Sequence, residues 1–530
     1  MKKTTRLLAC ALASVGCISG LSACGQVIEE GIPDGRTEIK ISLLSGGYGN
    51  DWLINLMDRA NKSQEKYWFT KTGDNKYTGP EIATRLQGGI VEADIYIGDD
   101  EIDMLVKQGS QGYLEDLTAV WDSCAPNETT KIKDKSLAGQ EFVSRYSKDG
   151  ALYALPYIYT LTGLIYDHDL FELMEWLATD TSTENGLTKG ADGIEGTYDD
   201  GLPATYQDFK TLVEKIYADN MVPFIRGDQL GWGTFESRIE PIWASYVGME
   251  NYKIGFTYNG TYTSSSGQTT EITPDTGYLT YTEALREGQA QATKFFNEIW
   301  MTGGMKYFYD QTGLSHTDAQ AHYVTSHAAQ KRVAMILEGD WWENEAKRVF
   351  AEDARENGDE YAYGKRDFRY MPLPAMDGQV EESDGKHYFS GGCGGAIFVY
   401  KQTDEEKKAA IFDFLRMYAS EENCLNYTKC NGAIMPYEYT IDDELKGTLS
   451  KFTQNMLEVR NDPSTVIVDT AGLTVSCPFI TMPDRWENIT VGGKSYPNPL
   501  NLFKETETTV AGYIQAVCEK YDETNWSSVR

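Results

Sequence analysis

The sequence predicts an α/β fold with more than one domain. From residue 38 onward, short apolar stretches typical of strands alternate with stretches of helical spacing. This order favours parallel strands that are joined by crossover helices. Removing a predicted leader over residues 1–23 leaves 507 residues, which is more than one typical hydrophobic core needs.

The first predicted strand covers 38–44, where apolar and polar side chains alternate, and a helix is expected over 51–60. The next predicted strand covers 93–98 and also precedes a helix. Ligands of such sheets bind beyond the carboxyl ends of the strands. The loops 45–51 and 98–101 are therefore the first candidates for a binding site.

Later parts of the chain repeat this alternation. Helices are expected over 203–219, 281–301 and 404–419, and buried strands over 332–337 and 396–400. In the helix over 404–419 the apolar side chains fall on one face, as in a helix that covers a core.

The chain begins with features of a secretory leader. Lys2, Lys3 and Arg6 precede an apolar stretch over 7–18. A charged start, a short apolar run and a small-residue cleavage site are typical of a signal peptide. The apolar run is shorter than the about 20 residues that a membrane-spanning helix needs. We therefore expect residues 1–23 to be removed.

The stretch Leu21-Ser22-Ala23-Cys24 resembles the lipobox of bacterial lipoproteins. This resemblance implies that Cys24 receives a lipid, which would hold the mature chain on the outer face of the cell membrane. Such an anchor favours a bacterium with a single membrane. An ordinary signal peptide with an incidental cysteine is the alternative. Residues 24–35 are expected to form a tether between the anchor and the folded body.

The net charge and the aromatic content predict a folded, acidic protein without a nucleic-acid partner. The formal charge is −32, and it becomes −35 when Lys2, Lys3 and Arg6 are removed. Such a surface repels nucleic acids, so we expect no nucleic-acid partner. The chain holds 34 Tyr, 19 Phe and 11 Trp residues, which is too many for a disordered chain.

An acidic stretch over 192–201 interleaves carboxylates with glycines. Calcium takes six to eight oxygen ligands and suits a tightly turning acidic chain, so Asp192, Asp199 and Asp200 are candidate ligands. The spacing is not that of an EF-hand, and a solvated acidic turn is the alternative. We expect no cofactor other than this cation.

A series of short motifs runs from about residue 38 to about residue 440 in a fixed order. The motifs are Ala-Leu-Pro-Tyr at 154–157, Gly-Leu-Ile-Tyr-Asp-His-Asp-Leu-Phe at 163–171, Pro-Ala-Thr-Tyr-Gln-Asp-Phe at 203–209, Gly-Asp-Trp at 339–341, Met-Pro-Leu-Pro at 371–374 and Asn-Gly-Ala-Ile-Met-Pro at 431–436. Their order resembles that of the extracellular solute-binding proteins of carbohydrate ABC transporters, the maltose-binding-protein-like group of family 1. Asp167-His168 departs from the Asn-Lys pair that is usual there.

The resemblance implies an α/β, two-lobed periplasmic-binding-protein-like fold of class II, with a hinge between the lobes. On this basis the first lobe would hold 36–160 and 376–420, and the second lobe 163–375 and 421–530. Hinge bending would close the lobes around a carbohydrate, and the high aromatic content favours an oligosaccharide. The partners would be ABC permease subunits and an ATPase on another chain, because this chain has no GxxxxGK[ST] motif. We expect a monomer without enzymatic activity.

Aromatic residues are the first candidates for sugar contacts, because flat rings stack on the C–H faces of pyranoses. Trp341 stands at the position that the family uses for stacking. Trp232 lies between two glycines, and Trp243 follows in the next predicted helix. Tyr157 lies at the expected hinge, and Trp486 is a further candidate. A place in the hydrophobic core is the alternative for each of them.

Polar candidates follow the first two strands. Tyr48, Asn50 and Asp51 follow the strand over 38–44, and two further aspartates follow the strand over 93–98. These two aspartates are Asp99 and Asp100. Their oxygens would accept hydrogen bonds from sugar hydroxyls, although Asp and Asn are equally common as helix N-caps. A further candidate for a polar contact is Arg85.

Two other functions remain open at this point. An extracellular glycoside hydrolase needs two carboxylates roughly 5–10 Å apart. The chain has 80 acidic residues, so their spacing in the sequence does not exclude such a pair. A binding protein for a non-sugar solute is the other alternative. The order of the motifs favours the sugar-binding protein.

Overall fold

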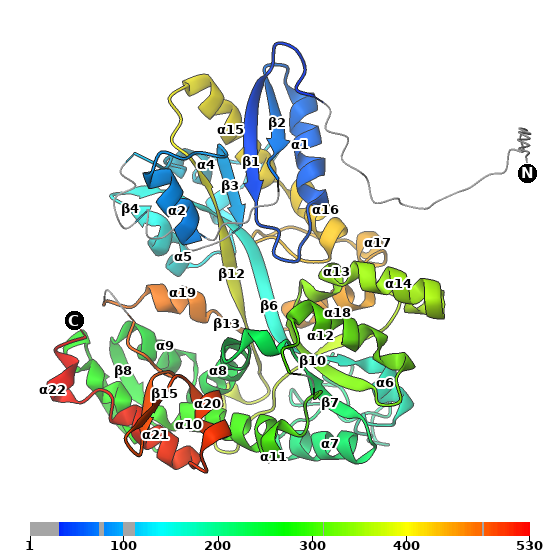
Figure 1. The fold of residues 1–530 in the computed structure, drawn as a ribbon, viewed down its shortest axis with the longest axis vertical. Helices are drawn as coiled ribbons and strands as arrows, with labels where there is room; N and C mark the ends of the chain where they lie inside the picture. Colours follow the sequence, from blue (N-terminus) through cyan, green and yellow to red (C-terminus); the bar gives the residue numbers. More distant parts are fainter. Residues whose placement is uncertain are drawn as a thin grey trace, which may run out of the picture.

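The computed structural model describes residues 31–73, 79–98, 106, 112–310, 312–479 and 482–529. Figure 1 shows two bodies joined by two long strands, β6 (Leu155–Asp167) and β12 (His387–Val399). We call these the crossing strands, the body that contains β1 the first lobe, and the other body the second lobe. The predicted α/β fold with two lobes is confirmed.

In the first lobe, β1 (Thr37–Leu43) pairs in parallel with β2 (Tyr67–Lys71) and with β3 (Ile95–Gly98). β3 also pairs with the far end of β12. The helices of this lobe are α1 (Asp51–Ser63), α2 (Gly79–Gln87), α4 (Thr118–Trp121), α5 (Gln140–Tyr146), α15 (Glu405–Tyr418) and α16 (Glu421–Asn431), and a short hairpin consists of β4 (Ser147–Lys148) and β5 (Ala151–Leu152).

The sheet continues into the second lobe through the crossing strands, in the order β2-β1-β3-β12-β6-β10-β7. β10 (Val333–Gly339) lies between β6 and β7 (Val222–Ile225), while β11 (Phe368–Met371) pairs with β6 and β13 (Thr465–Val468) with β12. Two hairpins complete the strands: β8 (Gly260–Thr263) with β9 (Thr269–Ile272), and β14 (Ile489–Val491) with β15 (Lys494–Tyr496).

Helices cover this larger lobe on both sides of the sheet (Figure 1). They are α6 (His168–Leu173), α7 (Tyr206–Ala218), α8 (Gly233–Val247), α9 (Met249–Thr257), α10 (Glu287–Phe295), α11 (Thr302–Met305), α12 (His316–Thr325), α13 (Trp342–Glu345), α14 (Lys347–Asn357), α17 (Asp443–Lys446), α18 (Lys451–Asn461), α19 (Thr470–Val475), α20 (Pro499–Glu505), α21 (Val510–Cys518) and α22 (Glu523–Trp526). Among the described residues, no helix is long and apolar enough to cross a membrane.

Local sequence explains where several helices begin. α7 starts at a capping box, in which Thr205 and Asp208 bind each other's backbone N–H groups. Asp404 caps α15 by accepting hydrogen bonds from the backbone of Glu406 and Lys407. The predicted helix over 281–301 is shorter than expected, because Thr282 takes an extended conformation and α10 begins only at Glu287.

The described residues form one large hydrophobic core in the first lobe and several hydrophobic clusters in the second lobe. The core of the first lobe includes Tyr427 and Tyr437, although the predicted boundaries place residues 421–530 in the second lobe. Conversely, Tyr388 and Phe389 of β12 belong to cores of the second lobe. The reason is that β12 crosses between the lobes, so its two ends pack on different cores. Tyr427 and Tyr437 therefore pack with the first lobe, and Tyr388 and Phe389 with the second, whereas the predicted lobe boundaries place them the other way round.

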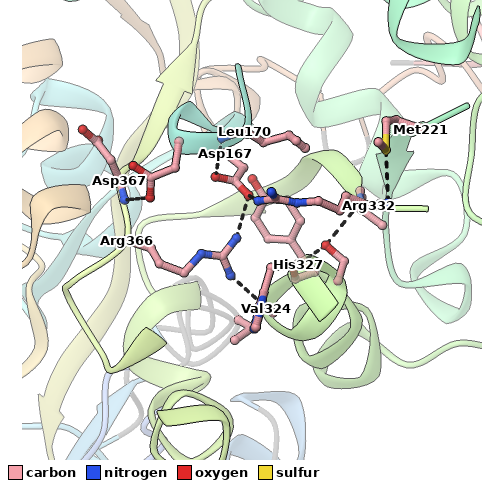
Figure 2. A network of polar contacts seen from close by, with 12 residues as sticks. Asp167, Leu170, Met221, Val324, His327, Arg332, Arg366 and Asp367 are labelled. Atoms are coloured by element: carbon pink, nitrogen blue, oxygen red, sulfur yellow. Dashed lines mark hydrogen bonds and ion pairs between the residues drawn. The ribbon is translucent and has the colours of Figure 1, made fainter. Parts of the chain in front are cut away.

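Asp167, where the sequence departs from the family pattern, ends β6 and organises a buried polar network (Figure 2). Its Oδ1 accepts a hydrogen bond from Leu170 N at 3.1 Å, which caps α6. Its Oδ2 accepts from Arg332 Nη2 at 3.0 Å and from Arg366 Nη2 at 2.6 Å. Arg366 Nη1 donates in addition to the carbonyl oxygen of Val324 at 2.6 Å. One carboxylate thus joins β6 to the start of β10 and to the segment before β11.

Candidate functional site

The two crossing strands bring together a tyrosine and a cysteine between the lobes. Tyr159 of β6 and Cys393 of β12 are both half-buried and stand opposite each other in the antiparallel register. Gly392, the residue before Cys393, has a positive φ of 121°, and a Cβ there would lie 2.5 Å from Cγ of Asp469. Only glycine therefore lets Asp469 approach the strand, where it also caps α19. α19 in turn contacts α5 of the first lobe.

Arg460 of α18 reaches this crossing point from the second lobe. Its Nη2 donates to the carbonyl oxygen of Tyr159 at 2.5 Å and to Asp340 Oδ2 at 3.0 Å. Its guanidinium carbon lies 4.8 Å from the centre of the Tyr159 ring, a distance typical of a cation–π contact. Nη1 is buried and has no hydrogen-bond partner among the described residues. The arginine therefore retains a donor beside Tyr159.

Asp340, directly after β10, connects the two lobes. Besides Arg460, it accepts hydrogen bonds from Tyr48 Oη at 2.9 Å and from Leu161 N at 3.3 Å. Tyr48 belongs to the first lobe, so this bond joins the lobes directly. Burial raises the pKa of the Asp340 carboxyl, while the charge of Arg460 opposes this shift. Burial and the charge of Asp340 also raise the pKa of Tyr48.

Trp341 lies at the same junction and is half-buried. Its indole packs edge-on against Tyr48, with ring centres 6.3 Å apart, and a Cβ at Gly47 would lie 3.0 Å from Trp341 Cδ1. Asn344 Nδ2 donates to the carbonyl oxygen of Gly47 at 2.6 Å. The loop after β1, predicted to meet a ligand, thus packs on the start of α13. We call Tyr48, Tyr159, Asp340, Trp341 and Arg460 the interlobe junction.

The structure gives Trp232 and Trp243 a packing role instead. Their side chains are 4% and 3% exposed and belong to the core of the second lobe. Both pack against Trp486, itself 1% exposed, whose Nε1 donates to Glu240 Oε1 at 3.1 Å. The glycines beside Trp232 do not expose its ring, because the ring turns inward onto Phe296. We therefore leave these three tryptophans out of the candidate site.

Tyr157 is also buried, at 1% exposure, between Trp52 and Tyr427 of the first core. The physical reason is that it alternates with the half-buried Ile158 and faces the core side of β6. Burial raises the pKa of its hydroxyl group. The half-buried tyrosine of this strand is Tyr159, two residues further along.

The polar candidates are spread more widely. Asn50 precedes α1 without capping it through its side chain, and Asp51 is exposed in the first turn. Arg85 forms an ion pair with Glu92 at 2.5 Å. Asp99 and Asp100 lie outside the described residues, as does Cys24.

Sequence reasoning missed Tyr159, Asp340, Arg460 and Asp469. Asp340 belongs to the same Gly-Asp-Trp motif as the predicted Trp341, so the motif could have indicated it as a site residue. Arg460 offered no local signal, because it meets Asp340 across 120 positions of the chain.

Two surface hollows lie away from the interlobe junction. One has a volume of about 940 Å³ and is lined by residues of the second lobe that include His168, Trp176 and Tyr198. Another, of about 470 Å³, lies beside Val247 and Gly378. Neither contains a residue of the interlobe junction.

The acidic stretch brings Asp192 and Asp199 together with a histidine, His387, and not with Asp200. Asp200 Oδ2 instead accepts hydrogen bonds from Asn185 Nδ2 at 2.5 Å and from Gly196 N at 2.7 Å. His387 lies far along the chain from this stretch, so no local pattern could indicate that it meets these aspartates.

Comparison with known proteins agrees with this arrangement of two lobes and crossing strands. A sequence model of the bacterial extracellular solute-binding proteins matches residues 74–442, well over half of the chain. The chain belongs to this family. The resemblance stated from the sequence motifs is thereby confirmed. No curated protein sequence matches the chain.

Solved structures of solute-binding proteins share the fold. RafE, a protein of Streptococcus pneumoniae, in its complex with raffinose is 15% identical, with 83% of this chain and 90% of RafE covered and a TM-score of 0.51. The cyclic alpha-maltosyl-1,6-maltose binding protein of Arthrobacter globiformis is 15% identical, with 92% and 98% covered and a TM-score of 0.51. A structure from work on xylan utilization by Caldanaerobius polysaccharolyticus is 14% identical, with 92% and 100% covered and a TM-score of 0.55.

Proposed function

We propose that this solute-binding protein is the receptor of an ABC importer and that it captures a carbohydrate, most simply an oligosaccharide, between its lobes. The observation that carries the proposal is Trp341, a half-buried indole at the junction of the two lobes. Neighbours of the same fold support it, since those described with raffinose and with a cyclic maltosyl-maltose bind sugars.

The chemistry of the interlobe junction suits a sugar. A pyranose presents weakly apolar C–H faces, which stack on aromatic rings, and hydroxyl groups, which need planar polar partners. Trp341 and Tyr159 supply half-buried rings. Arg460 supplies a buried Nη1 donor that no described residue uses. Tyr48 and Asp340 are positioning residues, because Tyr48 packs edge-on against Trp341 and Asp340 accepts a hydrogen bond from Arg460. Asp51, Asp99 and Asp100 remain predicted contacts.

The crossing strands suit a hinge. β6 and β12 are the two segments of the sheet that run from one lobe into the other (Figure 1). Bending at Gly391 to Gly395 of β12 would move the lobes without breaking either core. A ligand that binds the closed form better would shift the population toward closure.

We infer the remaining partners from the family. A lipid at Cys24 would hold the receptor near its permease, where a high local concentration replaces tight docking. The ATPase would be a separate chain, and the receptor itself would act as a monomer without turning over its ligand. This division of labour fits a bacterium with a single membrane.

Calorimetric titration of the protein without residues 1–23 tests the proposal. The panel contains raffinose, linear and cyclic malto-oligosaccharides, and xylo-oligosaccharides. We expect binding of at least one glycan with a stoichiometry of one. Heat from none of a broad glycan panel would contradict the proposal and favour a non-sugar solute.

Product analysis separates the receptor from a glycoside hydrolase. The bound glycan is incubated with the protein, and the mixture is analysed by chromatography. We expect the glycan to be recovered unchanged, whereas products that accumulate in proportion to protein concentration would contradict a receptor.

A further inference from the structure

Three side chains of the second lobe converge at a point that the proposed sugar site does not use. Asp192 and Asp199 belong to the loop between α6 and α7, and His387 is the first residue of β12. One possible ligand atom from each lies within 4.8 Å of the others. The Asp199 and His387 side chains are 1% and 2% exposed.

The loop holds Asp199 firmly in this position. Its Oδ2 accepts hydrogen bonds from Ala191 N at 2.7 Å and from Asp192 N at 3.3 Å, and its Oδ1 accepts from Thr197 Oγ1 at 2.7 Å. At Gly190, with a φ of 59°, a Cβ would lie 2.0 Å from Asp199 Oδ2, so only glycine fits. The carboxylate is therefore fixed by its own loop before any other group approaches.

Two buried atoms of the cluster have no hydrogen-bond partner among the described residues. They are Oδ2 of Asp192 and Nε2 of His387. His387 Nε2 lies 3.0 Å from Asp199 Oδ2, which is close enough for an ion pair but without hydrogen-bond geometry. Buried polar groups are nearly always satisfied, so these two atoms call for a further partner.

The cluster also holds two carboxyl groups for one imidazole. Asp192 and Asp199 both lie beside His387, so a cation among them would contact both carboxyl groups and the imidazole.

We infer that Asp192, Asp199 and His387 bind a divalent transition-metal cation, of which Zn²⁺ fits best. Zinc takes imidazole nitrogen and carboxylate oxygen as ligands, in sets of three protein groups with a fourth position for water or in sets of four. Mn²⁺ accepts the same kinds of donor, whereas calcium prefers oxygen alone. The imidazole therefore changes the cation expected from the sequence.

The cation would stabilise the second lobe at the start of β12 and would not contact the sugar. It would join the loop before α7 to the first residue of a crossing strand. Gly385, just before β12, already packs on this loop, since a Cβ there would lie 3.7 Å from Asp192 Cα. The inference does not depend on the proposed ligand, because the interlobe junction uses none of these residues.

Titration with the metals alone tests the inference. Protein treated with chelator and dialysed is titrated with Zn²⁺, Mn²⁺ and Ca²⁺ in separate calorimetric experiments, and its melting temperature is followed. We expect one equivalent of Zn²⁺ to bind and to raise the melting temperature, and chelator to reverse the rise. No binding of Zn²⁺ or Mn²⁺, or binding of Ca²⁺ alone, would overturn the inference.

A matched pair of variants locates the site. Asp192→Asn keeps the shape of a half-buried side chain but removes its charge, and we expect it to weaken Zn²⁺ binding at least tenfold. Asp200→Asn changes a carboxylate of the same loop outside the cluster and should bind Zn²⁺ like the wild type. Equal affinity of Asp192→Asn and wild type, or equal weakening by both variants, would overturn the assignment. If Asp192→Asn does not fold, the stoichiometry and chelator-reversible melting of the wild type decide the question.

Discussion

At the scale of single residues, Asp340 has the most connections of the interlobe junction. Its carboxylate, 1% exposed, accepts hydrogen bonds from Tyr48 of one lobe and from Arg460 of the other. A buried carboxylate is stable only when it is paired and hydrogen-bonded. Here Arg460 also binds Tyr159 of a crossing strand, and Tyr48 also packs against Trp341. The same bonds that stabilise Asp340 therefore fix the surroundings of Trp341.

Glu343, two residues after Trp341, gives a residue-scale prediction about pH. Burial raises its pKa from 4.5 to about 7. A glutamate with a raised pKa favours the folded state fully below pH 4.5, and this stability is lost as the pH rises toward 7. Glu343→Gln removes this loss and keeps the acceptor for Ser450 Oγ, which lies 2.5 Å from Oε2.

Urea unfolding of wild type and Glu343→Gln at pH 5 and pH 8 measures this effect. Between these values the free energy of unfolding of the variant should gain about 2–3 kcal/mol relative to wild type. Glu444→Gln, at an exposed glutamate, is the control and should show no such gain. The same difference between Glu343→Gln and wild type at both pH values would contradict the predicted burial effect.

At the scale of secondary-structure elements, the end of β6 depends on one carboxylate that has two separate functions. Asp167 caps α6 through Leu170 N and also forms ion pairs with Arg332 and Arg366 (Figure 2). An asparagine could replace it as a cap but not as a counter-charge. The departure from the family pattern at this position thus has a structural explanation.

Asp167→Asn should lower the free energy of unfolding by about 2–4 kcal/mol, because it leaves two arginines without their buried partner. Asp404→Asn is the matched control, since Asp404 caps α15 from an exposed position and Asn caps equally well. Denaturant unfolding compares the two variants. A loss at Asp167 no larger than that at Asp404 would show that the arginines do not depend on this carboxylate.

Patterns within single elements predicted much of the fold. The alternation over 38–44 corresponds to β1, and the Thr205 motif corresponds to the capping box of α7. The length of β12 was missed, because Gly391 to Gly395 resemble a break in a strand. Those glycines are needed where other backbone comes close: a Cβ at Gly395 would lie 2.3 Å from the carbonyl oxygen of Gly98.

The candidate site was only partly predictable, since it forms from distant segments. The Gly-Asp-Trp motif at 339–341 indicated Trp341, which packs against Tyr48 in the structure and stays a predicted sugar contact. No pattern could place Arg460 or His387 beside their partners. Trp232 and Trp243 were predicted to contact a sugar but lie in the hydrophobic core. A tryptophan between glycines or on a helix has the same sequence signature whether its ring faces solvent or a core, and tertiary packing decides.

At the scale of the whole molecule, two separately packed lobes joined by two strands form a body suited to hinge bending. The predicted tether would connect this body to a membrane. The interlobe junction and the proposed metal site lie in the folded body. The lipid anchor would lie outside it. Binding and attachment are therefore expected to be separable.

Cys24→Ala should release the protein from the membrane fraction into the medium and leave glycan binding unchanged. Cys17→Ala, a change of the same kind within the predicted leader, is the control and should remain with the membrane. Cell fractionation and immunoblotting measure the distribution. Membrane retention of Cys24→Ala would contradict the anchor, and lost binding would contradict the separation of the two roles.

The central claim is that Trp341 contacts a sugar between the lobes. It is tested by calorimetric titration of Trp341→Ala with the glycan that the wild type binds. Trp68→Ala is the matched control, because Trp68 is also half-buried but lies on β2, outside the junction. We predict that Trp341→Ala binds about 10- to 100-fold more weakly, a loss of about 1.4–2.8 kcal/mol, while Trp68→Ala binds like the wild type. Wild-type affinity in Trp341→Ala would contradict the account.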